Sequence, residues 1–246
     1  MNLVHWPYPK WIAHRGAGLI APENTLAAFR RGFDAGYRMF ECDAKLTSDG
    51  EVILLHDATL DRTTSGRGLA SQIDWPDVQC LDAGSWHSPR YAGEPVATLK
   101  RLSRFCQAND CLLNIEIKPV PGFEAVTGES IAKLAAELWR NAAVKPLLSS
   151  FSSVALKSAR TAAPSLYRGL LMHQLTPEWQ QEAQQVDCQA LICNYQILSA
   201  EMIRQIHALG LRCVSYTVND HAVAKGWLEA GIDGIITDEI DVFDPA

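Results

Sequence analysis

The sequence predicts an α/β protein of the (β/α)₈ barrel class. Eight short stretches are apolar or alternate between apolar and polar residues, as strands do. Helical patterns lie between most of them, which is typical of this barrel. The polar residues able to do chemistry follow the strand ends, and in a barrel those ends share one face. A doubly wound open sheet is the alternative, but no G-x-G-x-x-G motif follows the first strand. The predicted strands are 11–14, 39–46, 111–118, 146–151, 169–172, 190–193, 212–218 and 234–237.

The first strand leads into two basic residues. Trp11–Ala13 is a short apolar run that ends at His14 and Arg15, and Gly16 then allows the backbone to turn sharply. Asn24 is predicted to cap the first helix. Apolar residues follow it at helical spacing, at Leu26, Phe29 and Phe33.

The second strand places acidic residues on one face. Side chains on a strand alternate between its two sides, so in the stretch 40–46 the residues Glu41, Asp43 and Lys45 lie on the same side. Asp49–Gly50 predicts a two-residue hairpin turn after this strand.

A further strand and an irregular segment follow the turn. The strand 52–55 ends at His56 and Asp57. Residues 58–96 are rich in turn residues and polar side chains, and they are predicted to form a small lobe inserted after the second strand region. The whole chain, 1–246, is expected to be one catalytic domain.

The remainder of the chain alternates between helices and strands. Thr98 is predicted to cap the helix that follows the irregular segment, and Ser199 to cap a later one. In the strand 111–118, Glu116 and Lys118 share one face. The helices predicted after this strand are 130–139, 153–162, 178–185, 199–209 and 221–230.

Composition excludes several classes of protein. A net charge of −6 argues against a nucleic-acid binder, which would need a basic surface. The first ten residues do not read as a signal peptide, and no apolar stretch approaches the roughly 20 residues that span a bilayer. The seven cysteines form no C-x-x-C pair and are expected to be buried, reduced thiols. We expect a cytoplasmic enzyme without stable membrane association, and the sequence does not predict its oligomeric state.

Three carboxylates form a candidate metal site. Glu41, Asp43 and Glu116 come from two strands, and their hard oxygen atoms suit Mg²⁺, Mn²⁺ or Ca²⁺. The alternative is that these acids pair with basic side chains in a buried ionic cluster, which is expensive to desolvate. The basic residues available for such a cluster are Arg15, Lys45 and Lys118.

Two histidines are candidates for acid–base catalysis. His14 and His56 both follow strands and would converge on the acidic residues, and the pKa of histidine suits proton transfer near neutral pH. Arg15 and Lys118 add positive charge, so that a phosphate could be held by a cation and basic groups together. A structural role for either histidine, and a salt bridge from Arg15 to Glu41 or Asp43, remain open alternatives. Four residues near the rim are candidate substrate contacts, with caps or turns as the alternative: Asn194, Tyr216, Asn219 and Asp238. Trp86 and His87, in the segment 58–96, are candidates to roof the pocket.

Eleven short motifs occur in an order that identifies a family. They are A-H-R-G (13–16), P-E-N-T (22–25), E-C-D-A-K (41–45), D-G-E-V (49–52), L-H-D (55–57), D-R-T-T (61–64), L-D-A-G (81–84), N-I-E-I-K (114–118), S-S-F (149–151), Y-T-V-N (216–219) and D-G-I-I-T-D (233–238). On these motifs the chain resembles the glycerophosphodiester phosphodiesterases nearly end to end, and is most similar to their short cytosolic bacterial type.

The resemblance implies both a reaction and the roles of residues. It implies metal-dependent hydrolysis of glycerophosphodiesters, such as glycerophosphocholine or glycerophosphoethanolamine, to sn-glycerol 3-phosphate and an alcohol. His14 and His56 would be the general acid–base pair, and Arg15 and Lys118 would contact phosphate. The divalent cation (Mg²⁺, Ca²⁺ or Mn²⁺) would be held by Glu41, Asp43 and Glu116. Two departures from the family pattern, Tyr216 in place of Trp and Ala97 in place of Pro, concern the alcohol pocket. A phospholipase that docks on membranes, and a barrel that binds phosphodiesters without cleaving them, are the alternative functions.

Overall fold

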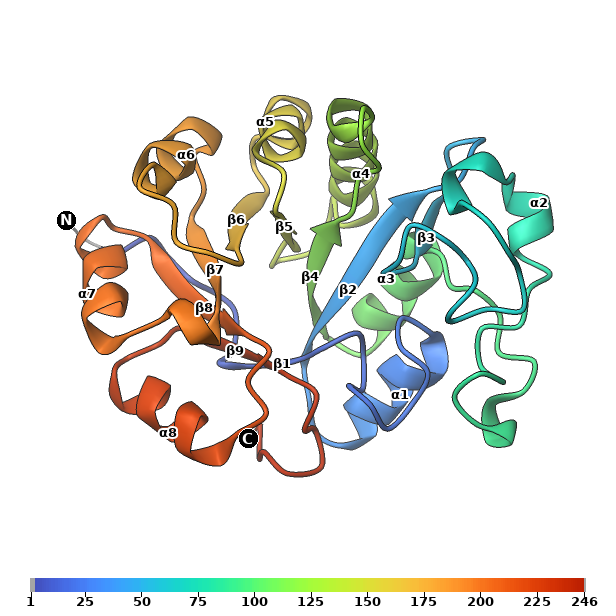
Figure 1. Ribbon diagram of the computed structural model, residues 1–246, viewed down its shortest axis with the longest axis horizontal. Helices are drawn as coiled ribbons and strands as arrows, with labels where there is room; N and C mark the ends of the chain where they lie inside the picture. Colours follow the sequence, from blue (N-terminus) through green and yellow to red (C-terminus); the bar gives the residue numbers. More distant parts are fainter. Residues whose placement is uncertain (1–2, 246) are drawn as a thin grey trace.

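Eight parallel strands close into a barrel with helices around its outside (Figure 1). The computed structural model describes residues 3–245. The barrel closes because β1 pairs with both β2 and β9. The barrel strands, in their order around it, are β1 (Trp11–Ala13), β2 (Met39–Leu46), β4 (Leu112–Ile117), β5 (Leu147–Ser150), β6 (Tyr167–Met172), β7 (Ala190–Asn194), β8 (Arg212–Tyr216) and β9 (Gly234–Thr237). The predicted fold class is confirmed, and every predicted strand is present with ends displaced by two residues or fewer.

Helices connect successive strands on the outside of the barrel. They are α1 (Leu26–Asp34), α3 (Leu99–Ala108), α4 (Glu124–Leu138), α5 (Ser153–Ala162), α6 (Trp179–Val186), α7 (Ala200–Ala208) and α8 (His221–Glu229). The predicted caps Thr98 and Ser199 are confirmed, because each side chain accepts a backbone N–H of the first turn. The prediction that Asn24 caps α1 is wrong: Thr25 does so, accepting from the Ala28 N–H. None of the helices within residues 3–245 has the length and apolar composition to span a membrane.

Helix α4 begins six residues before its predicted start at residue 130. The early turns carry Thr127 and Gly128, which break the apolar periodicity on which the prediction depends. A Cβ atom on Gly128 would lie 2.2 Å from the Ala155 carbonyl oxygen, so this part of α4 packs against the backbone of α5. Close helix packing through glycine explains why the pattern is weak there.

The turn after β2 is longer than predicted. Strand β3 (Val52–Leu54) runs antiparallel to β2, and the Thr47 N–H donates to the Glu51 carbonyl at 3.0 Å. Three residues therefore form the loop, and Gly50 has a φ of 85°. A three-residue hairpin loop needs one left-handed residue, which glycine adopts without strain.

The segment 58–96 packs beside the barrel with short elements of its own. It contains η1 (Ala70–Gln72), α2 (Trp75–Val78) and η2 (Pro89–Tyr91), and a further 3₁₀ turn, η3 (Tyr195–Ile197), follows β7. A small apolar cluster supports the segment against β3, made of Ile53, Leu55, Leu60, Ala70, Val78, Ala83 and Val96. All seven cysteines are free thiols, and six are buried, but Cys80 is exposed just after α2. The prediction of buried thiols is therefore wrong at that position, because short irregular elements cover little surface.

The barrel interior changes from apolar to charged along the strands. Ile12, Met39, Leu147, Ile192, Val214 and Ile236 fill its amino-terminal part as one buried cluster. Beyond Met39 on β2, the residues on the same strand face are Glu41, Asp43 and Lys45. The charged half of the interior therefore lies toward the carboxyl ends of the strands, where a (β/α)₈ barrel forms its active site.

Candidate active site

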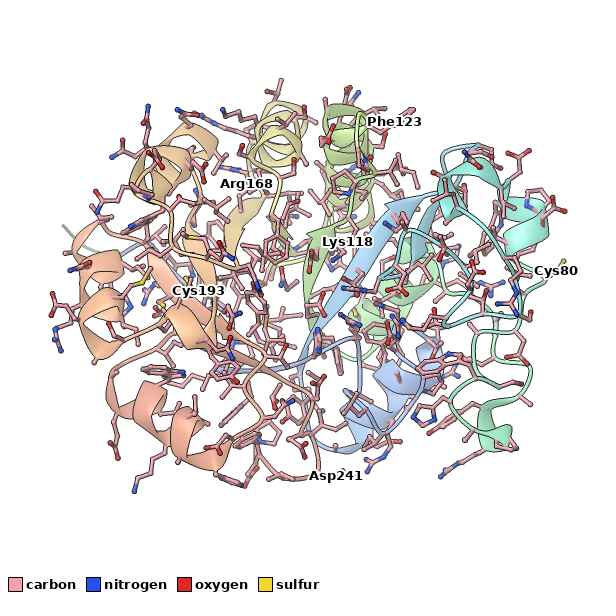
Figure 2. All side chains as sticks on the ribbon, viewed as in Figure 1. Cys80, Lys118, Phe123, Arg168, Cys193 and Asp241 are labelled. Atoms are coloured by element: carbon pink, nitrogen blue, oxygen red, sulfur yellow. The ribbon has the colours of Figure 1, made fainter. Side chains whose placement is uncertain are left out.

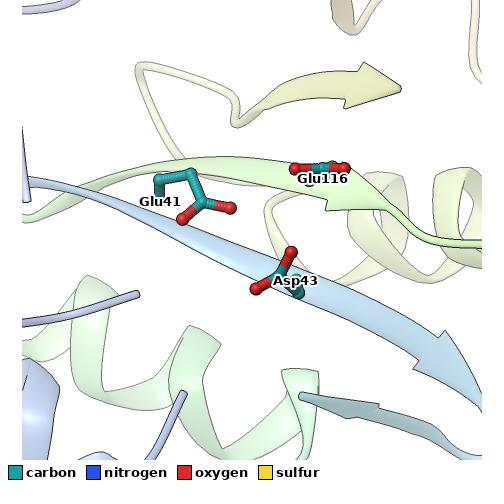
Figure 3. Close-up of side chains that lie close together, drawn as sticks. All are labelled: Glu41, Asp43 and Glu116. Carbon is teal, nitrogen blue, oxygen red and sulfur yellow. The ribbon is translucent and has the colours of Figure 1, made fainter. Parts of the chain in front are cut away.

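The three acidic residues predicted to bind a metal lie together on two adjacent strands. Asp43 of β2 is the direct neighbour of Glu116 of β4, and Glu41 lies two residues before Asp43 on the same strand face. Figure 3 shows the three carboxylates turned toward one another from these strands. One oxygen of each lies within 4.8 Å of the others.

Burial and charge make this acidic cluster unfavourable without a positive charge. Burial raises the pKa of Glu41 to about 8, and the Asp43 carboxylate adds to this. Burial and the same neighbouring charge also raise the pKa of Glu116. Glu41 Oε1 and Asp43 Oδ1 are buried and accept no hydrogen bond, and the buried Glu116 Oε1 lies 3.0 Å from the Lys118 ammonium. These convergent carboxylate oxygens, two of them without a hydrogen bond, fit a hard divalent cation.

The two basic residues predicted to contact phosphate border the acids. Arg15 Nε lies 3.2 Å from Asp43 Oδ2, and its Nη1 donates to Glu23 at 2.9 Å. Lys118 Nζ lies 3.0 Å from Glu116 Oε1 and 3.6 Å from Asp43 Oδ1. The salt bridge to Asp43 that the sequence left open for Arg15 is thus present. These cations lie where they could also meet a phosphate held beside the cluster.

The loop after β1 is shaped to bring its backbone to the acids. Arg15 and Gly16 have φ values of 49° and 96°, and the Arg15 N–H donates to Glu41 Oε2 at 3.0 Å. A Cβ atom on Gly16 would lie 2.9 Å from the Phe29 nitrogen, so this position requires glycine. Asn24 also has a left-handed φ, of 59°.

Asn24 therefore has a different place from the predicted helix cap. Its Nδ2 donates to Asp43 Oδ2 at 2.8 Å, and its Oδ1 accepts the Asp43 backbone N–H at 3.0 Å. These two hydrogen bonds, made by a residue outside β2, orient Asp43. Nothing local to Asn24 in the sequence indicates the contact, because the two residues meet only when α1 packs on the barrel.

Each candidate catalytic histidine is hydrogen-bonded to an aspartate. His14 Nδ1 lies 2.7 Å from Asp238 Oδ1, and His56 Nδ1 lies 2.7 Å from Asp57 Oδ1. A carboxylate can only accept, so each Nδ1 is the protonated nitrogen and each ring is held in one orientation. Asn219 supports Asp238 in turn, donating from its Nδ2 at 2.9 Å. The sequence predicted Asp238 as a rim residue, but not as the partner of His14.

The two histidines differ in their electrostatic surroundings. Burial opposes the charged form of His14, but the hydrogen bond with Asp238 and the charge of Glu41 outweigh it and raise the pKa. At His56, burial lowers the pKa, although Asp43 acts in the opposite direction. The pair therefore contains one imidazole that favours the protonated form and one that favours the neutral form.

Arg62 links both sides of the site, and the sequence analysis did not assign it a role. It donates to Asp57 at 2.7 and 3.0 Å and to Glu23 at 2.8 Å through two nitrogens. Asp57 holds His56, while Glu23 holds Arg15. The only indication in the sequence is its place in the D-R-T-T motif.

The remaining predicted substrate contacts have structural partners of their own. Asn194 Oδ1 accepts the Gln196 N–H, as a cap of η3, and Asn194 Nδ2 lies 3.2 Å from His173 Nδ1. The Tyr216 hydroxyl donates to the Met172 carbonyl at 3.1 Å. A substrate role for Asn194 or Tyr216 stays a prediction.

The predicted roof residues lie at the rim beside the first loop. His87 Nε2 lies 3.0 Å from the Leu19 carbonyl oxygen, and the Trp86 ring packs edge-on against His87. The segment 58–96 therefore reaches the loop that carries His14 and Arg15.

Comparison with known proteins gives a consistent result. The family model described as "Glycerophosphoryl diester phosphodiesterase family" matches residues 14–242. A glycerophosphodiester phosphodiesterase from Caldanaerobacter subterraneus is 34% identical over 233 residues, which is 93% of each chain. The structure is similar to an Oleispira antarctica phosphodiesterase in complex with the product sn-glycerol-3-phosphate, with a TM-score of 0.88, 31% identity and coverage of 95% and 94% of the two chains. It is also similar to a glycerophosphodiester phosphodiesterase from Agrobacterium tumefaciens, with a TM-score of 0.81, 26% identity and coverage of 97% and 100%.

Proposed function

We propose a reaction for this chain, which belongs to the glycerophosphoryl diester phosphodiesterase family and is a phosphodiesterase of glycerophosphodiesters. It releases sn-glycerol 3-phosphate from glycerophosphocholine or glycerophosphoethanolamine. The reaction uses a divalent cation and two histidines. The observation that carries this proposal is a cluster of three carboxylates, two buried and one half-buried, flanked by two histidine–aspartate pairs at the carboxyl ends of the strands.

The cation would be held by Glu41, Asp43 and Glu116. The unsatisfied oxygens of Glu41 and Asp43 and the raised pKa of Glu41 support this assignment, because a bound cation would favour the ionised carboxylates. When bound, Mg²⁺, Mn²⁺ or Ca²⁺ supplies Lewis acidity toward a phosphoryl oxygen. Lys118 and Arg15 would provide the remaining positive charge around the phosphate, through contacts like those they make with the acids.

The histidines would move the two protons that hydrolysis requires. One imidazole accepts the proton of the attacking hydroxyl, and the other donates a proton to the departing alkoxide. Asp238 and Asp57 hold the Nδ1 of each ring, so that Nε2 is the nitrogen that exchanges protons. The opposite pKa shifts of His14 and His56 suit a pair with one donor and one acceptor.

We further propose that residues 1–246 act as one catalytic domain and that the segment 58–96 is a lobe that completes the site. Arg62 supports this, since it is the residue of that segment that contacts Asp57 and Glu23. Asn194 and Tyr216 would contribute at most to the outer part of the substrate pocket, because their polar atoms already have partners.

The test is release of sn-glycerol 3-phosphate from glycerophosphocholine and from glycerophosphoethanolamine by the purified protein. We expect release with added Mg²⁺, Mn²⁺ or Ca²⁺, loss of release in EDTA, and recovery when the cation is restored. The Glu116→Gln variant should need more cation for the same rate. A lysophospholipid is the comparison substrate: its cleavage without cleavage of either water-soluble diester would favour the phospholipase alternative. No release of sn-glycerol 3-phosphate from either diester by folded protein with any of the three cations would refute the proposal.

A further inference from the structure

Lys45 is a buried cation without an acidic partner. The residue is 3% exposed, and its Nζ donates to the backbone carbonyl of Lys118 at 3.1 Å. The acids on the same two strands pair elsewhere, Asp43 with Arg15 and Glu116 with Lys118. Among residues 3–245, no ion pair includes Lys45.

A purely structural role does not account for this arrangement. Taking an ammonium group out of water is strongly unfavourable unless a negative charge compensates it, and one neutral carbonyl does so only in part. A methionine or leucine at position 45 would fill the same space without that penalty. Asp43 and Glu116 act on Lys45 only from beyond ion-pair distance, and they pair with Arg15 and Lys118. The lack of a direct acidic partner is therefore the feature that needs an explanation.

A pocket lined in part by Lys118, the residue that also contacts Glu116, offers room for a negative charge. It has a volume of about 190 Å³ and lies at the carboxyl ends of β2 and β4, between η1 and the start of α4. Lys45 and Lys118 line it together with Ser71 and Gln72, and Phe123 forms part of its wall. Figure 2 labels Lys118 beside the end of β4 and Phe123 at the start of α4.

Lys118 connects this pocket to the reaction centre. Its Nζ lies 3.0 Å from Glu116 of the acidic cluster, while its backbone carbonyl holds the ammonium of Lys45. Lys118 thus contacts the acidic cluster and also lines the pocket. The described residues that line the pocket include two lysines, polar groups on Ser71 and Gln72, and no aspartate or glutamate.

We propose that this pocket receives the alcohol part of the substrate and that Lys45 selects alcohols that carry a carboxylate. The inference rests on the proposed function and narrows its substrate class: a serine-like alcohol would supply the missing negative charge, whereas choline would bring a second positive charge. Ser71 and Gln72 are placed to hydrogen-bond the polar atoms of such an alcohol, and Phe123 to cover its carbon atoms. Lys45 would thus be a specificity residue that takes no part in proton transfer.

Two substrates that differ only in the carboxylate test this. The ratio of kcat/KM for glycerophosphoserine over glycerophosphoethanolamine should be about tenfold or more in the wild type, the scale of one charge-assisted contact. In Lys45→Met the ratio should fall toward one. The matched control is Lys133→Met, which removes the same charge from an exposed position, 63% exposed and paired with Glu129, and should keep the wild-type ratio.

A stability measurement separates specificity from folding. With a saturating divalent cation present, Lys45→Met should have a Tm equal to or above that of the wild type, because the cation then balances the acidic cluster and the substitution removes a buried charge that has no ion pair. A lower Tm combined with an unchanged ratio would show a structural lysine and overturn the inference. An equal ratio in the wild type and Lys45→Met, or a wild-type preference for glycerophosphoethanolamine, would also overturn it while leaving the proposed function intact.

Failure of the proposed function would have a different signature, in which the wild type cleaves neither diester. In that case, calorimetry of the binding of the same two diesters tests whether Lys45 selects a carboxylate. Tighter binding of glycerophosphoserine that is lost in Lys45→Met supports the inference, and equal binding of both diesters refutes it.

Discussion

Replacing Arg62 by methionine tests whether the segment 58–96 positions the proposed catalytic groups. The guanidinium holds Asp57 and Glu23 through bonds of 2.7–3.0 Å, and these two acids hold His56 and Arg15. A methionine keeps most of the side-chain volume and removes all of these contacts. We therefore expect a small loss of stability and a larger loss of turnover.

The expected magnitudes follow from exposure and from the number of groups released. The Arg62 side chain is 44% exposed, so solvent screens its two ion pairs, and together they contribute about 1 kcal/mol to the free energy of unfolding. For a chain of this length, that lowers Tm by about 2–4 °C. Turnover should fall roughly 10- to 100-fold, since the proposed acid–base group His56 and the proposed phosphate contact Arg15 both lose their support.

The assay is kcat and KM for glycerophosphoethanolamine, with Tm measured on the same samples. Arg67→Met is the matched control, because Arg67 belongs to the same segment but is 81% exposed and lies 3.6 Å from Asp61. Arg62→Lys should give an intermediate kcat, since an ammonium group cannot donate to both carboxylates in the planar geometry of a guanidinium. A kcat for Arg62→Met within twofold of the wild type would refute the positioning role. A fall in Tm above 10 °C would show instead that Arg62 acts on folding.

Three further outcomes are expected. His14→Ala and His56→Ala should each lower kcat by roughly 100-fold or more at unchanged Tm, and near wild-type turnover in either would remove that histidine from the mechanism. A divalent cation at about 100 times its Kd should raise Tm by roughly 5–10 °C in the wild type and by less in Glu41→Gln, and an equal rise in both would argue against the carboxylate site. Hydrogen bonds from the Ser85 hydroxyl and from backbone N–H groups lower the pKa of Asp82 in the folded protein. The Asp82 carboxylate therefore stabilises the fold above about pH 4, and this stabilisation is lost as the pH falls through the pKa that Asp82 has in the folded protein. Asp82→Asn should therefore lower Tm at pH 7, and the difference should shrink below about pH 4; a difference independent of pH would contradict this.

Local patterns in the sequence are sufficient for most of the architecture. Strand period and flanking turns locate the barrel strands, and Thr98 and Ser199 mark helix starts because a cap depends on neighbouring residues alone. The predictions fail where a distant contact decides the conformation. Asn24 leaves its expected cap to bond Asp43, and α4 starts early because Gly128 packs against α5.

The composition of the candidate site was also accessible from the sequence. Glu41 and Asp43 share a face because side chains alternate along a strand, and Glu116 joins them because parallel strands of one barrel end on the same side. His14 and His56 could be placed at strand ends for the same reason. Their roles in catalysis remain proposals.

Only the tertiary structure decides which side chains meet. Asp238 and His14 are 224 positions apart, and they come together because β9 closes the barrel onto β1. Arg62 reaches Glu23 across 39 positions because the segment 58–96 folds back over the first loop. Among residues 3–245 Lys45 forms no ion pair, because Arg15 and Lys118 pair with the acids of the same strands, and that balance depends on distances between side chains. Periodicity sets the face on which a side chain lies, whereas barrel closure and packing set its partners.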